Sequence, residues 1–176
     1  MRVLAIGDPT QRSMYFTDDT EFVNEEPFEA ALLASVLQTL PRNKVQEALE
    51  NIYNLLPDGG RIIVTVPSLE WACRNVVTQN DISLAAYIAI YGVEGEPHLT
   101  GFTLLWLRRS LEEAGFIVVE ARSEGFKMQF KMGALKTEEP ASQHIAVGIK
   151  RKIDELKAID WMDEAVPAGK IEVATK

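Results

Sequence analysis

The sequence predicts an α/β fold, with an open, mostly parallel sheet and helices on both faces. Apolar residues Val45, Leu49 and Ile52 recur at spacings of three and four before Pro57, which is typical of one face of a helix. The run 62–66 follows and is apolar or β-branched at successive positions, as expected for a strand covered by helices on both sides. The same helix–strand order returns downstream. This alternation implies parallel strands joined by right-handed crossovers.

The downstream half supplies a second helix and three further strand segments. Leu104, Leu107 and Leu111 form an apolar stripe that begins near Thr100 or Thr103 and ends at Gly115. Strands are predicted at 116–119 and 144–150, and the alternation over 126–132 indicates an edge strand or a long hairpin arm. In the first half, Asn43 and Gln46 have the spacing of a helix capping box.

Two segments leave alternatives open. Residues 27–40 have helical propensity with Pro27 at a helix start, but a buried strand at Ala30–Ala34 followed by a turn is the rival interpretation. The stretch 81–92 is apolar nearly all round, so a helix there must be covered. It forms either a lid over a pocket or, through Ile82–Tyr91, a surface on which a second copy docks.

Length and composition restrict the class of protein. The 176 residues suit one domain, predicted over 1–151 with a lid or interface insertion at 69–101 and a C-terminal appendage at 152–176. No apolar run approaches the roughly 20 residues of a membrane span, and the N-terminus lacks signal-peptide features, so we expect a cytoplasmic protein without membrane contact. The single cysteine, Cys73, excludes an internal disulfide, and with only two histidines no metal site is expected.

The net charge of −8 argues against a nucleic-acid partner, because such partners require a basic face. A small-molecule substrate is expected instead.

The stretch 55–69 reads Leu-Leu-Pro-Asp-Gly-Gly-Arg-Ile-Ile-Val-Thr-Val-Pro-Ser-Leu. It resembles the region around the fifth strand of Rossmann-like S-adenosylmethionine-dependent methyltransferases, and two further stretches resemble the same family. The second comprises 98–102 and 111–116, and the third is 26–40, where Leu37-Gln38-Thr39 stand at the family's Leu-Glu-His positions. The resemblance covers about residues 1–151. It implies an antiparallel last strand, a strand at Ala30–Ala34, and an abbreviated first crossover.

The resemblance also implies a site for S-adenosylmethionine. Gly7 and Asp8 stand where the family has a glycine-rich loop, although Pro9 follows them. Asp18 or Asp19 would accept hydrogen bonds from the ribose hydroxyls, and Ser35 would lie at the tip of the fourth strand of the family. The structural alternatives are a strand-end glycine at position 7, turn acids at 18 and 19, and a helix cap at Ser35.

The implied activity is methyl transfer to a small-molecule or sugar-type acceptor, with 69–101 covering the substrate. His98 has the side chain of a general base, but it also suits a hydrogen-bonded loop anchor, and no catalytic residue is assigned. The altered glycine loop supports another hypothesis, a catalytically inactive relative that acts as an interaction or assembly module. A nucleotide-binding module that uses Gly7-Asp8-Pro9 is a third, without a phosphate-binding Gly-x-x-x-x-Gly-Lys loop.

Overall fold

The structure, a computed structural model, describes residues 3–6, 28–79, 83–132 and 135–151. Its elements, in chain order, are β1 (Val3–Ile6), β2 (Ala30–Ala34), the 3₁₀ helix η1 (Leu37–Thr39), α2 (Arg42–Leu55), β3 (Arg61–Pro67), α3 (Leu69–Gln79), α4 (Leu84–Tyr91), β4 (Gly92–Val93), β5 (Glu96–Pro97), α5 (Leu104–Glu113), β6 (Phe116–Met132) and β7 (Leu135–Lys150). The appendage at 152–176 lies outside the described residues, so it stays a prediction, as does the domain boundary before it.

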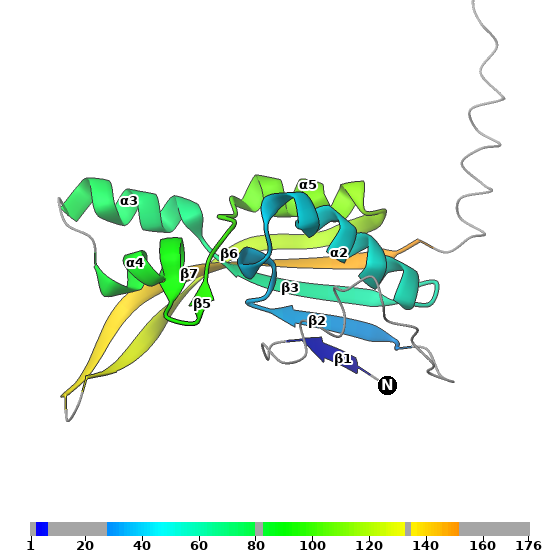
Figure 1. Ribbon diagram of the computed structural model, residues 1–176. Coiled ribbons are helices and arrows are strands. Elements are labelled where there is room, and N and C mark those ends of the chain that lie inside the picture. Colours follow the sequence, from blue (N-terminus) through cyan, green and yellow to red (C-terminus); the bar gives the residue numbers. More distant parts are fainter. Residues whose placement is uncertain (1–2, 7–27, 80–82, 133–134, 152–176) are drawn as a thin grey trace, which may run out of the picture.

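The five-stranded sheet has the order β1-β2-β3-β7-β6 (Figure 1). Strands β1, β2 and β3 are parallel, and β7 pairs antiparallel with both β3 and β6. The last strand in sequence is therefore the antiparallel one, and the predicted α/β class, an open sheet whose strands begin parallel and whose last strand is antiparallel, is confirmed. The strand at Ala30–Ala34 is also confirmed, and the helical alternative for that stretch is wrong.

Helices α2 and α5 lie on the same side of the sheet (Figure 1). The β2–β3 connection and the β3–β6 connection advance in the same direction across the sheet, so right-handed crossovers place both helices on one face. The main core fills the space between that face and the two helices. Its fully buried members include Leu33, Leu49, Ile52, Val64, Leu107 and Leu111.

The other face of β3 is less covered than the sequence predicted. Ile62, Val64 and Val66 are buried against the helices, whereas Ile63 is 37% exposed on the opposite face. The expectation of a strand buried on both faces is thus wrong, because both crossover helices belong to one side. A helix does contact β7 from the other side, since the α4 residue Ala85 donates its backbone N–H to Glu139. Alternation along β7 puts Glu139 and the helix-facing residue His144 on opposite faces.

The predicted helices are confirmed, but one predicted cap is wrong. Helix α5 begins after Thr103, whose hydroxyl accepts a hydrogen bond from Trp106 N–H at 3.1 Å, and Gly115 after it has a φ of 99°. Helix α2 begins instead after Pro41 without a side-chain cap. Gln46 does not bond back to Asn43, because its amide donates to Glu50 within the helix.

The segment between β3 and α5 builds a small layer of its own, as Figure 1 shows. It contains α3, α4 and the two-stranded β4–β5 hairpin, and α3 packs against α4 through Ala72, Ala86 and Ala89. Strands β6 and β7 extend beyond the other strands as a long hairpin, which confirms the arm predicted at 126–132. This layer and the arm enclose the candidate site.

Candidate functional site

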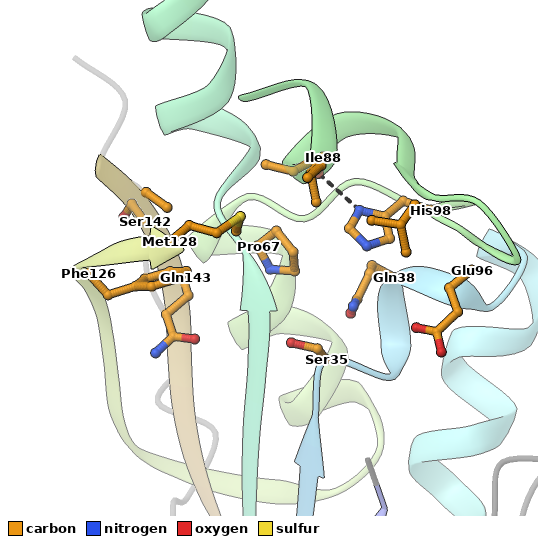
Figure 2. Close-up of a pocket in the computed structure, with 13 residues that line it drawn as sticks. Ser35, Gln38, Pro67, Ile88, Glu96, His98, Phe126, Met128, Ser142 and Gln143 are labelled. Carbon is orange, nitrogen blue, oxygen red and sulfur yellow. Dashed lines mark hydrogen bonds between the residues drawn. The ribbon is translucent and has the colours of Figure 1, made fainter. Parts of the chain in front are cut away.

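A cavity of about 260 Å³ lies at the carboxyl ends of β2 and β3. Parallel α/β sheets bind ligands at this edge. Figure 2 shows Ser35 at the end of β2 and Pro67 at the end of β3, with Ile88 and His98 above them. The described residues that line the cavity are Ser35, Gln38, Pro67, Ile88, Ala89, Val93, Glu96, His98, Phe126, Met128, Ala141, Ser142 and Gln143. None of these is a lysine or an arginine, and Glu96 is the acid among them.

Ser35 has a strained backbone at the floor of the cavity. Its φ is 54°, the left-handed region that non-glycine residues rarely adopt. Its backbone N–H donates to the Thr65 carbonyl at 3.0 Å, which holds the turn against β3. Strain of this kind gathers at functional sites. The structure thus brings Ser35, predicted from the resemblance, into the cavity.

Helix α4 and the hairpin after it form the roof. Ser83 caps α4 by accepting from Ala86 N–H at 3.2 Å, and its hydroxyl donates to Asn75 in α3 at 3.0 Å. Glu139 on β7 accepts from Ala85 N–H at 2.9 Å, which sets a carboxylate at the amino end of α4. The helix ends at Gly92, with φ 79° and ψ −159°. These bonds fix the roof to both α3 and the hairpin arm.

His98 belongs to both the roof and the cavity wall. Its Nδ1 lies 3.1 Å from the Ala89 carbonyl, and its backbone N–H donates to the Tyr91 carbonyl at 3.0 Å. A carbonyl only accepts, so Nδ1 is the donor in this bond. The anchoring role proposed from sequence is therefore confirmed, while the ring also faces the cavity (Figure 2).

Gln38 is a site residue that sequence reasoning noted only as a departure from the family pattern. Its backbone carbonyl accepts from Leu99 N–H and Thr100 N–H, at 2.7 and 3.0 Å. Its side chain is 3% exposed, and within the described part of the chain its Oε1 has no hydrogen-bond partner. A buried polar atom without a partner is uncommon in folded proteins. Its position in a turn after a predicted strand was the available signal.

A hydrogen-bond network around the buried His144 joins α3 and α5 to the hairpin arm beside the cavity. His144 on β7 is 1% exposed, and its Nε2 donates to Glu70 Oε2 at 2.6 Å. Its Nδ1 lies 2.9 Å from the Ser123 hydroxyl oxygen, at hydrogen-bonding distance. The other Glu70 oxygen accepts from Leu104 N–H at 2.9 Å. Burial raises the pKa of the Glu70 carboxyl, but hydrogen bonds from backbone N–H groups and from His144 outweigh it, so this pKa lies below its ordinary value.

The lowered pKa of Glu70 gives a pH-dependent prediction. Its stabilisation is complete above the pKa of the unfolded chain and is lost as the pH falls through the folded value. We expect Glu70→Gln to lower the free energy of unfolding by about 1 kcal/mol at neutral pH, a modest figure because the side chain is 42% exposed. This difference should shrink toward zero by about pH 3.

Urea unfolding of both proteins from about pH 7 to about pH 3 measures that difference. Glu113→Gln, at an exposed position of α5, is the control and should track the wild type throughout. A gap between Glu70→Gln and wild type that stays constant with pH would contradict the assignment.

The other predicted site residues cannot be compared with the cavity. Gly7, Asp8, Asp18 and Asp19 lie outside the described residues. Strand β1 ends at Ile6, which pairs with Leu33, so its carboxyl end lies beside that of β2. Cys73 is exposed, and among the described side chains no group of three or more His, Cys, Asp or Glu is placed to hold a metal. The described helices are all too short or too polar to cross a membrane.

Comparison with known proteins finds solved structures of similar fold but no matching sequence family. No family model matches the chain, and no curated protein matches it. Among solved structures, it is similar to human N-acetylserotonin methyltransferase in complex with SAM, with 20% identity over 78% of this chain and 32% of that one, and a TM-score of 0.46. It is also similar to the N-methyltransferase NodS of Bradyrhizobium japonicum WM9, with 18% identity over 77% of this chain and 53% of that one, and a TM-score of 0.43.

A third similar structure is an O-methyltransferase family protein of Burkholderia thailandensis, with 9% identity over 74% of this chain and 32% of that one, and a TM-score of 0.44. The chain thus spans about a third to about half of these proteins. These likenesses concern the fold alone. What each of those proteins binds or methylates is a property of that protein.

Proposed function

We propose that the protein transfers a methyl group from S-adenosylmethionine to a small acceptor. The observation that carries this proposal is the cavity at the carboxyl ends of β2 and β3. Ser35, with its left-handed backbone, lies at the bottom of this cavity, and α4 covers it. A cavity of about 260 Å³ has room for a small metabolite. It is too small to hold that metabolite and the whole cofactor together. The cofactor would then lie across the neighbouring ends of β1 and β2.

The residues assigned to the cofactor follow the sequence resemblance. Gly7 would approach it with backbone atoms, Asp8 would face its ammonium group, Asp18 or Asp19 would hold the ribose, and Ser35 would border it from β2. The described end of β1 fits this arrangement, since it lies level with the end of β2. When bound, S-adenosylmethionine supplies a methyl group on a positively charged sulfur, already activated for transfer.

The task of the chain is then positioning and exclusion of water. Pro67, Ile88 and Met128 give the cavity apolar walls, while Ser35, Gln38 and His98 supply polar atoms that orient an acceptor. Holding two reactants in line supplies a large part of the acceleration in such reactions. The absence of lysine and arginine from the described lining favours a neutral or cationic acceptor over an anionic one.

Calorimetry with S-adenosylmethionine and S-adenosylhomocysteine tests the proposal. We expect one site with a Kd in the micromolar range, equivalent to about −8 kcal/mol at 1 µM. Asp18→Asn and Asp19→Asn form the test pair, and the variant that removes the ribose acceptor should bind about tenfold more weakly. Glu113→Gln, an exposed acid-to-amide change on α5, should leave the affinity unchanged.

No heat at millimolar ligand would overturn the proposal and favour the inactive interaction module. A specific observation supports that alternative: α4 exposes Leu84, Tyr87 and Tyr91, whose side chains are 38%, 47% and 56% exposed. The homo-oligomer proposed through Ile82–Tyr91 would use this face, although Ile82 lies outside the described residues. Ile88 lines the cavity, so the lid interpretation of this helix has the stronger support.

A further inference from the structure

Ser123, His144 and Glu70 form a chain of hydrogen-bonding groups that the proposed methyl transfer does not use. The Ser123 hydroxyl oxygen lies 2.9 Å from His144 Nδ1, and His144 Nε2 lies 2.6 Å from Glu70 Oε2. The three residues belong to β6, β7 and α3, so the sheet and a helix assemble them together. A hydroxyl, an imidazole and a carboxylate in this order are the groups that activate a nucleophilic serine.

The Glu70 carboxylate fixes the protonation of the imidazole. Its second oxygen accepts from Leu104 N–H, so the carboxylate is held in place from both sides. Burial raises the pKa of the Glu70 carboxyl, but hydrogen bonds from backbone N–H groups and from His144 outweigh it, so the group is ionised at neutral pH. An ionised carboxylate only accepts, so His144 Nε2 carries a proton. In the neutral ring the lone pair is then on Nδ1, beside the Ser123 hydroxyl.

The pairing of β6 with β7 directs the backbone of Ser123 outward. Lys150 and Ser142 each bond through their backbone to residues that flank β3, so alternate residues of β7, His144 among them, turn their backbone groups toward β3. Ser123 and His144 therefore form a non-hydrogen-bonded pair, in which facing side chains lie closest. The N–H of Ser123 points away from β7, at the edge of the described sheet, where it can donate to an oxyanion.

We propose that Ser123 is the nucleophile of a second active site that hydrolyses small carboxylic esters, with His144 as general base and Glu70 as its positioning residue. Ser123 Oγ forms a bond to the ester carbonyl carbon, and its proton moves to Nδ1. The bond between that carbon and the alcohol oxygen then breaks, and the departing alcohol takes the proton. Water next attacks the acyl group through the same base, the carboxylic acid leaves, and the proton returns to Oγ. This reaction needs no S-adenosylmethionine, so it goes beyond the proposed function.

The surroundings of Ser123 favour a small neutral ester as substrate. Ser123 is exposed, whereas His144 is 1% exposed, so a substrate reaches the hydroxyl from solvent while the base stays shielded from water. Arg122, the cation next to Ser123 in β6, already pairs with Glu120 and Glu124, which favours a neutral acyl group over an anionic one. An ester is favoured over an amide because an alcohol is the better leaving group.

The test uses diisopropyl fluorophosphate, which forms a covalent bond with activated serines, and 4-nitrophenyl acetate, whose hydrolysis releases a coloured phenolate. We expect the wild type to take up the phosphoryl label at Ser123, mapped by tandem mass spectrometry, and to hydrolyse the ester. Ser123→Ala should take up no label. Glu70→Gln, which removes the charge beside Nε2 but keeps the hydroxyl and the ring, should react with both probes about 100-fold more slowly at neutral pH.

Thr78→Ala is the matched control, because it removes another exposed hydroxyl, one that donates to the Arg74 carbonyl within α3. It should react like the wild type. Absence of label from the wild type, a label at another residue, or a wild-type rate in Glu70→Gln overturns the proposal. Ser123 is exposed, so Ser123→Ala should keep the fold, and the mapped label decides the matter even if Glu70→Gln does not fold. No cofactor is added, so either result leaves the S-adenosylmethionine calorimetry unaffected.

Discussion

Gly92→Ala is expected to disrupt the roof of the cavity and to lower the free energy of unfolding by about 3 kcal/mol or more. With φ 79° and ψ −159°, Gly92 has a backbone conformation that is essentially confined to glycine. A Cβ at this position would also collide with the Glu96 carbonyl oxygen and would lie 2.7 Å from His98 N. The hairpin would have to move, and His98 would move with it.

Gly95→Ala is the matched control for this prediction. Gly95 has a similar φ of 85°, but a Cβ there meets no atom within 4 Å. It should cost only about 1–2 kcal/mol, the penalty of the left-handed backbone. Urea unfolding of the two variants separates the effect of the collision from that of dihedral strain. Equal losses in both variants would show that the contacts of Gly92 have no special importance.

Phe102→Ala is expected to have the other large effect, a loss of about 3–5 kcal/mol. Phe102 is 1% exposed and stacks on Trp106, with ring centroids 4.4 Å apart. Its backbone carbonyl accepts from Leu69 N–H, so its place in the core also fixes the start of α3. Truncation would leave a cavity where α3, α5 and the sheet meet. A domain of this size has only about 5–15 kcal/mol of stability in total.

Leu105→Ala supplies the comparison for Phe102→Ala. Leu105 is 59% exposed on α5, so the same chemical truncation should cost less than about 0.5 kcal/mol. Both variants are measured by urea unfolding at neutral pH, followed by tryptophan fluorescence, which reports on Trp106 beside the deletion. A loss below about 1 kcal/mol for Phe102→Ala would contradict its place in the core.

The sequence pattern correctly predicted the helices that bury one regular face against the sheet. Helices α2 and α5 were predicted close to their observed bounds, because their signals depend on residues that are near in sequence. These signals are the apolar stripe of Val45, Leu49 and Ile52 and the cap at Thr103. Helix α3 was not predicted, because its burial depends on the packing of Ala72 against Ala86 and Ala89 of α4. The exposure of Ile63 was missed for a related reason, since sheet topology decides which face the helices cover.

The candidate site was predicted only in part. Ser35 was assigned from the resemblance, and its left-handed backbone gives that assignment a physical basis. The bond between the Ala89 carbonyl and His98 could not be predicted from residue spacing, because it forms only when the hairpin after α4 folds back on the helix. The bond from Ala85 N–H to Glu139 joins residues that are far apart in the sequence, so spacing gives no sign of it either. For His98 the anchoring hypothesis is confirmed by its bonds to the Ala89 and Tyr91 carbonyls, whereas the general-base hypothesis stays a prediction.

The position of β7 between β3 and β6 has a consequence for biosynthesis. The ribosome makes β6 before β7, yet in the described sheet β6 pairs with β7 alone. Until Lys150 has emerged, a nascent chain can assemble β1, β2 and β3 but leaves the edge of β3 bare, a state open to aggregation. The two last strands must therefore join as a hairpin, and ribosomal stalling before that point would yield a sheet that cannot be closed.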